Sequence, residues 1–517
     1  MNLLKATGTI GGLTLVSRVL GFARDMIGSR MLGASHANDA FNLAFLLPNI
    51  FRRLFAEGAF SSGFVPLFSR RLASGGHADA EAFSNEILAV FMPALLVVTV
   101  LFEIFMPGIL ALVASGYEKV PGKLELAVEL TRWTFPYLLF ISLVALLSGV
   151  LNSLTRFAVA AFAPALLNIA LIIALLISPP SNVQTVRTMA IAVLVGGVAQ
   201  FVLCWLAVRR AGVRLHFGRP RLTPAVRELV ILILPATAAA GVYQISQLFY
   251  GYFSTLLGEG ALTMLSYADR LNQLPLSIIG TALGVAILPA ISQAIARDDA
   301  AEAADVQARA FDLSMLLTLP ATLALAVGAV PIIGALFQGG EYTLRAAHTT
   351  GNILAILVSG LPAYVLVKVL TPAFYARKDV KTPVLIAMAV LLLSIPANFL
   401  LIPRIGIYSL ATVTSTGAWV NFLWLFAILY VRGHFRMPAW LVGRVTRQLL
   451  SALVMAAALF GVRALFFDWY FGGVVERAIG LAVLVGTGAL VYFGVAFLIG
   501  GVDRQAIASL RRKKGPE

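Results

Sequence analysis

Charged residues are scarce in this sequence of 517 amino acids. They make up 12% of the chain, whereas hydrophobic residues make up 60%, and the mean hydropathy is +0.91. Soluble domains carry about 25% charged residues. The composition therefore excludes an ordinary soluble domain and predicts an all-α protein that crosses a membrane many times.

Cysteine is almost absent as well. Cys204 is the only one, and it lies in an apolar run. A single thiol excludes a disulfide within the chain and a metal site built from cysteines.

Motifs for nucleotide hydrolysis and metal catalysis are also missing. The sequence contains no Gly-x-x-x-x-Gly-Lys-[Ser/Thr] loop, no His-Glu-x-x-His and no carboxylate cluster spaced to hold Mg²⁺ against a prenyl diphosphate. We therefore expect no enzyme, no cofactor and no bound metal. Transport by such a protein would draw on the membrane potential, an ion gradient or removal of the product.

Long apolar runs dominate what is present. At about 20 residues per crossing, the chain divides into fourteen spans. Because this number is even, both termini lie on the same side of the membrane. The basic tail 511–514 marks that side as cytoplasmic. The spans lie near 8–32, 38–68, 84–114, 127–151, 159–179, 187–208, 228–257, 262–294, 311–337, 346–374, 383–402, 407–431, 446–467 and 478–500.

The formal net charge of +15 follows from this topology. About 24 of the 39 Lys and Arg residues fall in loops assigned to the cytoplasmic side, so we expect no nucleic-acid partner. The longest of these loops is a basic linker at 211–227. It is either an ordinary cytoplasmic loop or a ribbon lying on anionic headgroups.

Prolines recur at a nearly constant offset and indicate an internal repeat. The paired positions are Pro48 with Pro275, 227 residues apart, Pro136 with Pro362, 226 apart, and Pro164 with Pro383, each of which opens a span. Because each repeat holds six spans, the two copies are parallel, as in transporters with a site between two halves. The predicted divisions are lobes at 1–210 and 228–432, two further helices in 446–500, and a cytoplasmic tail at 501–517.

Arginines interrupt the first two spans. A cation in the hydrocarbon core costs between about 3 and 10 or more kcal/mol unless it faces protein or water. Arg18 and Asp25 share one helical stripe, and Asn49 and Arg52 share another. In the second half Arg270 begins a similar stripe with Gln273 and Ser277. We therefore predict a wet cavity lined by cations from both lobes.

Acidic residues near these arginines leave alternatives open. Arg53 and Glu57 form an i, i+4 pair. Arg24 pairs with either Asp25 or Asp39, and Asp39 is alternatively a helix N-cap. The remaining acid of the set is Asp269.

Arg18, Arg52 and Arg270 remain as the set without an assigned acid. Guanidinium groups match phosphate oxygens, so these residues favour a pyrophosphate-bearing substrate over a monovalent solute. For each arginine taken alone, a structural ion pair or a snorkelling position is the alternative. Lys368, in the tenth span, is either an interhelical contact or part of the transport path.

Several motifs here resemble those of the MurJ (MviN) family of lipid II flippases, in the superfamily of multidrug, oligosaccharidyl-lipid and polysaccharide exporters. The resemblance spans essentially the whole chain. The motifs that carry it are Ser-Arg-Val-Leu-Gly-Phe-Ala-Arg-Asp at 17–25, Asp-Ala-Phe at 39–41, Leu-Pro-Asn at 47–49, Arg-Arg-Leu-Phe-Ala-Glu-Gly-Ala-Phe at 52–60, Phe-Val-Pro at 64–66 and Tyr-Ala-Asp-Arg-Leu at 267–271.

The resemblance implies fourteen helices in two lobes around a cationic cavity that receives the head of undecaprenyl-linked lipid II. It also implies a groove for the lipid tail beside spans thirteen and fourteen, a location in the bacterial inner membrane, and function as a monomer among membrane lipids. The matching arginines are Arg18, Arg24, Arg52 and Arg270, with Asp25 and Asp39 as acidic partners.

Two positions depart from the pattern of some family members. Gln273 stands where some members carry a glutamate, so a charge role there is open. Spans seven and eleven offer neutral groups such as Gln244 and Asn398 where some members bind sodium through aspartates.

Two other functions stay open from the sequence. One is a multidrug or other lipid-linked oligosaccharide exporter of the same superfamily, although a site for cationic drugs would need carboxylates rather than excess arginine. The other is a membrane enzyme acting on polyprenyl diphosphates, which would need metal ligands or a nucleophile.

Overall fold

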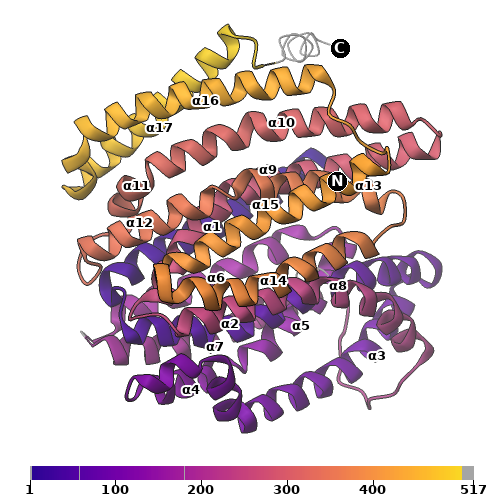
Figure 1. Cartoon of the computed structure of the whole chain (residues 1–517). Helices are drawn as coiled ribbons and strands as arrows, with labels where there is room; N and C mark the ends of the chain where they lie inside the picture. Colours follow the sequence, from indigo (N-terminus) through magenta and orange to yellow (C-terminus); the bar gives the residue numbers. More distant parts are fainter. Residues whose placement is uncertain (1–2, 57–58, 180, 503–517) are drawn as a thin grey trace. The chain divides into compact units, whose positions relative to one another are not determined.

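The computed structural model of the protein describes residues 3–56, 59–179 and 181–502. Within these ranges every regular element is a helix, and the only β-type pairing is an isolated bridge between Gly339 and Tyr342 (Figure 1). The predicted all-α class is confirmed.

The chain divides into two units, and unit 1 comprises Met1–Thr263 and Gly339–Tyr342. The short second segment belongs here because Glu341 N donates to the Arg30 carbonyl oxygen at 2.8 Å. The helices of unit 1 are α1 (Leu3–Leu32), α2 (His36–Ala56), α3 (Ala59–Val113), η1 (Ser115–Lys119), α4 (Lys123–Thr134), α5 (Tyr137–Ser153), α6 (Phe157–Ile177), α7 (Asn182–Arg210) and α8 (Pro224–Thr255).

Unit 2 comprises Met264–Gln338 and Thr343–Glu517. Helix α9 begins in unit 1 and continues into unit 2. The helices from there on are α9 (Ala261–Ala296), α10 (Ala300–Val327), α11 (Ala329–Phe337), α12 (Leu344–Val358), α13 (Leu361–Tyr375), α14 (Lys381–Ile405), α15 (Tyr408–Val431), α16 (Ala439–Leu465), η2 (Phe467–Phe471) and α17 (Val474–Leu498).

Ten helical segments among the described residues are long and apolar enough to cross a membrane. They coincide with the third to sixth and the ninth to fourteenth predicted spans. The other four predicted spans coincide with α1, α2 with the start of α3, α8 and α9. The total of fourteen stays a prediction. The ten segments are Gly63–Val113, Lys123–Ser153, Phe157–Ile177, Asn182–Arg210, Ala300–Val327, Leu344–Tyr375, Lys381–Ile405, Tyr408–Val431, Ala439–Leu465 and Val474–Leu498.

Left-handed turns recur along the chain with the same offset as the prolines. Five pairs of residues with positive φ lie 218 to 227 positions apart, and both members of each pair lie at a break between helices or, for Gly76, at the kink within α3. Three of these residues are not glycine, so the turns are set by the fold rather than by glycine alone. This recurrence supports the internal repeat, while the lobe boundaries stay a prediction. The pairs are Gly33 with Gly260, Gly76 with Asp298, Gly122 with Gly340, Thr155 with Lys378, and Gly212 with Gly433.

Phenylalanines at helical spacing form the core of unit 1 around α3. Phe60, Phe64 and Phe68 are four residues apart and therefore lie on one face of the helix. The Phe64 ring stacks on the Phe60 and Phe83 rings, with centroids 5.3 and 5.5 Å apart. All four side chains are buried. All four rings belong to α3, and they pack the two parts of this helix against each other across its kink at Gly76. Helix α3 also packs against α5 and α8.

In unit 2, α16 packs against both α17 and α10 (Figure 1). Asp312 of α10 accepts from Arg444 Nη1 and from Gln448 Nε2 of α16, both at 2.8 Å. Tyr492 of α17 donates to the Leu316 carbonyl oxygen at 2.8 Å. These side chains join the last two long helices to α10. The lipid-tail groove predicted beside them stays a prediction.

The turn between α13 and α14 contains Asp379, whose titration predicts that the stability of the fold depends on pH. Hydrogen bonds from Arg432 and Thr382 lower the pKa of Asp379 from 3.8 to about 2, and the Arg432 Nη1 to Asp379 Oδ2 distance is 2.6 Å. A lowered folded-state pKa stabilises the fold above the unfolded pKa, and the stabilisation is lost as the pH falls towards 2. We expect Asp379→Asn to lower the unfolding temperature at pH 7 and to have no effect near pH 2, measured by thermal unfolding in detergent. An equal loss at both pH values would contradict this assignment.

Candidate functional site

Arg24 of α1 is held by two side chains. Its Nη2 and Nε atoms lie 2.6 and 3.0 Å from Asp25 Oδ1, and its Nη1 donates to Asn168 Oδ1 of α6 at 3.1 Å. Of the two partners proposed for Arg24 from the sequence, the structure shows Asp25. Asp39 binds elsewhere, so the alternative Arg24 to Asp39 pair is wrong.

Asn168 is a residue that the sequence reasoning missed. Its Nδ2 donates to the Ser17 carbonyl oxygen at 3.0 Å while its Oδ1 binds Arg24. A Cβ on Gly21 would lie 3.4 Å from the same amide, so α1 and α6 approach closely here. The only sequence signal is an isolated asparagine in an otherwise apolar helix. Asn168 therefore sets the direction of the Arg24 guanidinium.

The second arginine group lies at the end of α2, one to two turns after Pro48. Arg52 Nε donates to Asn49 Oδ1 at 3.1 Å, which places these two predicted site residues together. Arg53 Nη1 lies 3.4 Å from the Tyr243 hydroxyl of α8. Glu57, the predicted partner of Arg53, lies outside the described residues.

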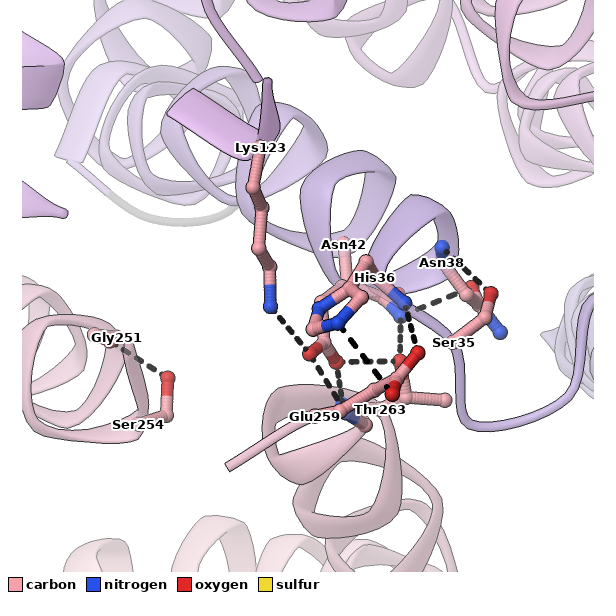
Figure 2. A network of polar contacts seen from close by, with 11 residues as sticks. Ser35, His36, Asn38, Asn42, Lys123, Gly251, Ser254, Glu259 and Thr263 are labelled. Atoms are coloured by element: carbon pink, nitrogen blue, oxygen red, sulfur yellow. Dashed lines mark hydrogen bonds and ion pairs between the residues drawn. The ribbon is translucent and has the colours of Figure 1, made fainter. Parts of the chain in front are cut away.

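Asp39 of α2 lies in a buried polar cluster. Its Oδ2 accepts from Lys123 Nζ and from Gly260 N, both at 2.9 Å. Its Oδ1 accepts from Thr263 N at 3.0 Å and from Thr263 Oγ1 at 2.9 Å. The side chains of Lys123 and Asp39 are only 3% and 1% exposed, and Figure 2 shows Lys123 and Thr263 converging there.

This geometry makes Asp39 the cap of a helix other than its own. The first amides of a helix have no partner within it and carry partial positive charge. Asp39 supplies acceptors to the start of α9, where Gly260 has a φ of +72° and a Cβ would lie 2.4 Å from the Ala34 carbonyl oxygen. The predicted capping role is thus present, but it acts on α9 rather than on α2.

Lys123, also missed from the sequence, neutralises this carboxylate. Its Nζ lies 4.1 Å from the centre of the Tyr117 ring, a cation–π contact. Burial, and then the charge of Asp39, raise the pKa of Tyr117 well above its usual range. Pro121 and Gly122 precede Lys123, and such residues are typical of a turn, so the local sequence gives no sign of a buried ion pair.

Further polar contacts surround the same cluster. Asn42 donates to Thr263 Oγ1 at 3.1 Å, and His36 Nε2 lies 3.3 Å from Glu259 Oε2 (Figure 2). The half-exposed His36 and Glu259 lie at its edge, so the cluster links the start of α2 to the turn before α9.

The predicted residues of unit 2 lie on α9 and α13. Arg270 is exposed, and the neighbouring Asp269 accepts a hydrogen bond from Gln273 Nε2. Gln273 therefore acts as a neutral donor to a carboxylate. Lys368 of α13 is half-buried, and a Cβ on Gly280 of α9 would lie 2.7 Å from its Cδ, so this lysine makes an interhelical contact.

The described residues contain no group of three or more His, Cys, Asp or Glu side chains placed to hold a metal. Gln244 and Asn398 are buried, and Asn398 Nδ2 donates to the Ser394 carbonyl oxygen at 2.8 Å. The polar groups instead form two kinds of site in unit 1, arginines with amide or carboxylate partners and a buried carboxylate that caps a helix. Guanidinium groups suit a phosphate-bearing ligand.

The family model "Lipid II flippase MurJ" matches residues 29–480 of this chain. A "Probable lipid II flippase MurJ" of Rhizobium meliloti is 40% identical, with 98% of this chain and 96% of that protein covered. A "Lipid II flippase MurJ" of Burkholderia cenocepacia is 36% identical, with 97% and 98% covered.

Solved structures agree on the fold. "Lipid II flippase MurJ, inward closed conformation" matches with a TM-score of 0.78 and 24% identity, covering 95% of this chain and 98% of that one. A multidrug resistance MATE family transporter in an inward-facing conformation matches with a TM-score of 0.66 and 16% identity, covering 80% and 95%. At these identities the structural likeness shows the fold alone, whereas the family model and the curated relatives match nearly the full chain. The chain therefore belongs to the lipid II flippase MurJ family.

Proposed function

We propose that this protein is a transporter that moves lipid II, the undecaprenyl-pyrophosphate-linked peptidoglycan precursor, across the bacterial inner membrane. The observation that carries the proposal is the 40% identity, over nearly the full length of both chains, to a protein named as a lipid II flippase. It is a multi-pass protein of the bacterial inner membrane and acts in peptidoglycan biosynthesis.

The site residues fit a substrate with a pyrophosphate. Arg18, Arg24, Arg52 and Arg270 are the proposed contacts to phosphate oxygens, with Asn49 beside Arg52 and with Lys368 as a further cation. Arg24 is directed by Asp25 and Asn168. Because a guanidinium has five donors, Arg24 retains donors for a ligand while it holds both partners.

The proposed mechanism is alternating access, driven by the membrane potential or by an ion. We propose that the protein works as a monomer and that both of its termini lie in the cytoplasm. Bonds from Asp39 to the turn before α9 would close one end of the path, and their release would open it. Asp269, Arg53 and Glu57 are proposed as further groups that adjust charge during this change.

The alternative of a multidrug exporter is not favoured. The likeness to the MATE transporter rests on 16% identity and carries the fold alone. The cations on α1, α2 and α9 also oppose binding of a cationic drug.

The test is a transport assay with purified protein in liposomes. We expect lipid II to move between leaflets and a cationic dye to remain where it was added. Undecaprenyl diphosphate without the sugar and peptide head should compete for binding if the pyrophosphate is gripped. Transport of the dye with no movement of lipid II would overturn the proposed function.

A further inference from the structure

A groove in unit 1 lies between α3 and α4, and it is not lined by Arg24, Arg52 or Asp39. It is formed by Pro107 of α3 and by one face of α4 that includes Leu124, Val128 and Trp133. Its volume is about 460 Å³. This space is large enough for the headgroup of a lipid but not for a bulky glycopeptide.

Charges of both signs line the same face of α4. Glu125, Glu129 and Arg132 all contribute to the groove. Glu125 and Glu129 are four residues apart and Glu129 and Arg132 are three apart, so the Cβ atoms within each of these pairs are neighbours at about 5–6 Å. Glu125 and Arg132 are seven residues apart, about 10 Å along the helix, so a headgroup that contacts both lies between the ends of their long side chains.

Each charged side chain keeps capacity for a ligand. Arg132 donates from Nε to the Glu103 carbonyl oxygen at 3.3 Å, and its guanidinium has four further N–H donors. Glu129 Oε2 lies 2.8 Å from Arg187 Nη2, while Glu125 is exposed. The groove therefore offers an arginine fork for a phosphate and a carboxylate for a cation.

The position of the groove indicates a lipid ligand. The segment Lys123–Ser153 is apolar enough to cross a membrane, and Arg132 and Trp133 are exposed within its first eleven residues. Tryptophan concentrates at the boundary between membrane and water, and arginine near a span end extends its charge towards the headgroups. The groove thus lies where phospholipid headgroups are found.

We propose that this groove binds one zwitterionic phospholipid with a primary ammonium, of the phosphatidylethanolamine type. Its phosphate accepts hydrogen bonds from Arg132, and its ammonium donates to Glu125 with support from Glu129. The glycerol and the first acyl carbons lie against Leu124, Val128 and Pro107. The carboxylates Glu103, Glu125 and Glu129 outnumber the two arginines, Arg132 and Arg187. The net charge around the groove is therefore negative, so an anionic lipid that lacks the ammonium binds less well.

Lipid binding to the purified, delipidated full chain tests the proposal. Native mass spectrometry would measure binding of phosphatidylethanolamine and phosphatidylglycerol with the same acyl chains. We expect the ethanolamine lipid to bind about tenfold more tightly, the effect of one charge-assisted hydrogen bond. Equal binding of the two lipids, or a preference for the glycerol lipid, would overturn the proposal.

Variants locate the site and separate the two charges. Glu125→Gln should remove the preference for the ethanolamine lipid, and Arg132→Gln should weaken binding of both lipids. Arg404→Gln and Glu341→Gln, at exposed positions that do not line the groove, are controls that should bind as the unchanged protein does. Retention of the full preference in both groove variants would place the lipid elsewhere. Unfolding temperatures measured in detergent would show that the variants are folded.

Discussion

Replacing Arg52 or Arg270 with alanine is expected to abolish the outward exposure of lipid II while the protein still inserts into the membrane. Each guanidinium would supply charge-assisted hydrogen bonds to a pyrophosphate, each worth about 1.5–3 kcal/mol. The loss of one such bond to the pyrophosphate weakens substrate binding by at least about tenfold, and we expect transport to fall by at least the same factor. An assay of lipid II accessible on the outer leaflet, in cells that depend on the variant, measures this loss.

Lysine at the same positions separates charge from geometry. Arg52→Lys keeps the cation but loses the planar fork, which also binds Asn49. We expect intermediate transport in this variant. The matched control is Arg309→Gln, which removes an exposed arginine paired with Asp305 within α10, and it should transport normally. Normal transport by both alanine variants would refute the proposed roles.

The second large effect is expected at Asp39. Asp39→Ala removes the ion-pair partner of the buried Lys123 and leaves Gly260 N and Thr263 N without their acceptor. Removing one member of a buried ion pair costs about 3–5 kcal/mol, because the other charge stays buried. We expect this loss in the free energy of unfolding, measured by denaturant or thermal unfolding in detergent.

A double variant separates the ion pair from the helix cap. Asp39→Ala with Lys123→Met removes both charges and should recover part of the loss, because no unpaired ammonium remains. The remainder reports the cap on α9. Glu228→Gln, which breaks the exposed pair with Arg70, is the control and should cost no more than about 1 kcal/mol. A loss at Asp39 as small as at Glu228 would show that the cluster does not stabilise the fold.

The sequence predicted the helical class and the internal repeat because both depend on local chemistry. Apolar runs of membrane length form helices wherever they occur, and prolines at a constant offset mark duplicated helices. The turns with positive φ follow the same offset, although Thr155, Asp298 and Lys378 gave no local signal for it. The structure alone shows those turns, because the backbone of a non-glycine residue adopts them only under the constraint of its neighbours.

Some of the polar contacts were predicted, while the role of these residues in binding stays a prediction. Arginines and acids in apolar helices are conspicuous in a sequence, which indicated Arg24, Asp25, Arg52 and Asp39, and helical spacing placed Asn49 beside Arg52. Their partners were found where they lie close along one helix, as in Asn49 with Arg52 and Arg24 with Asp25.

What the sequence by itself determined is the kind of protein and which side chains carry its charge, because these follow from composition and helical spacing. Only the tertiary structure decided the partners of Asp39. Lys123 lies 84 residues away and Thr263 lies 224 residues away, and no helical period relates such positions. Packing of α2 against α4 and α8 brings Asp39 close to Lys123 at the start of α4 and to the turn that follows α8, and burial makes the pairing obligatory because an unpaired buried charge is too costly.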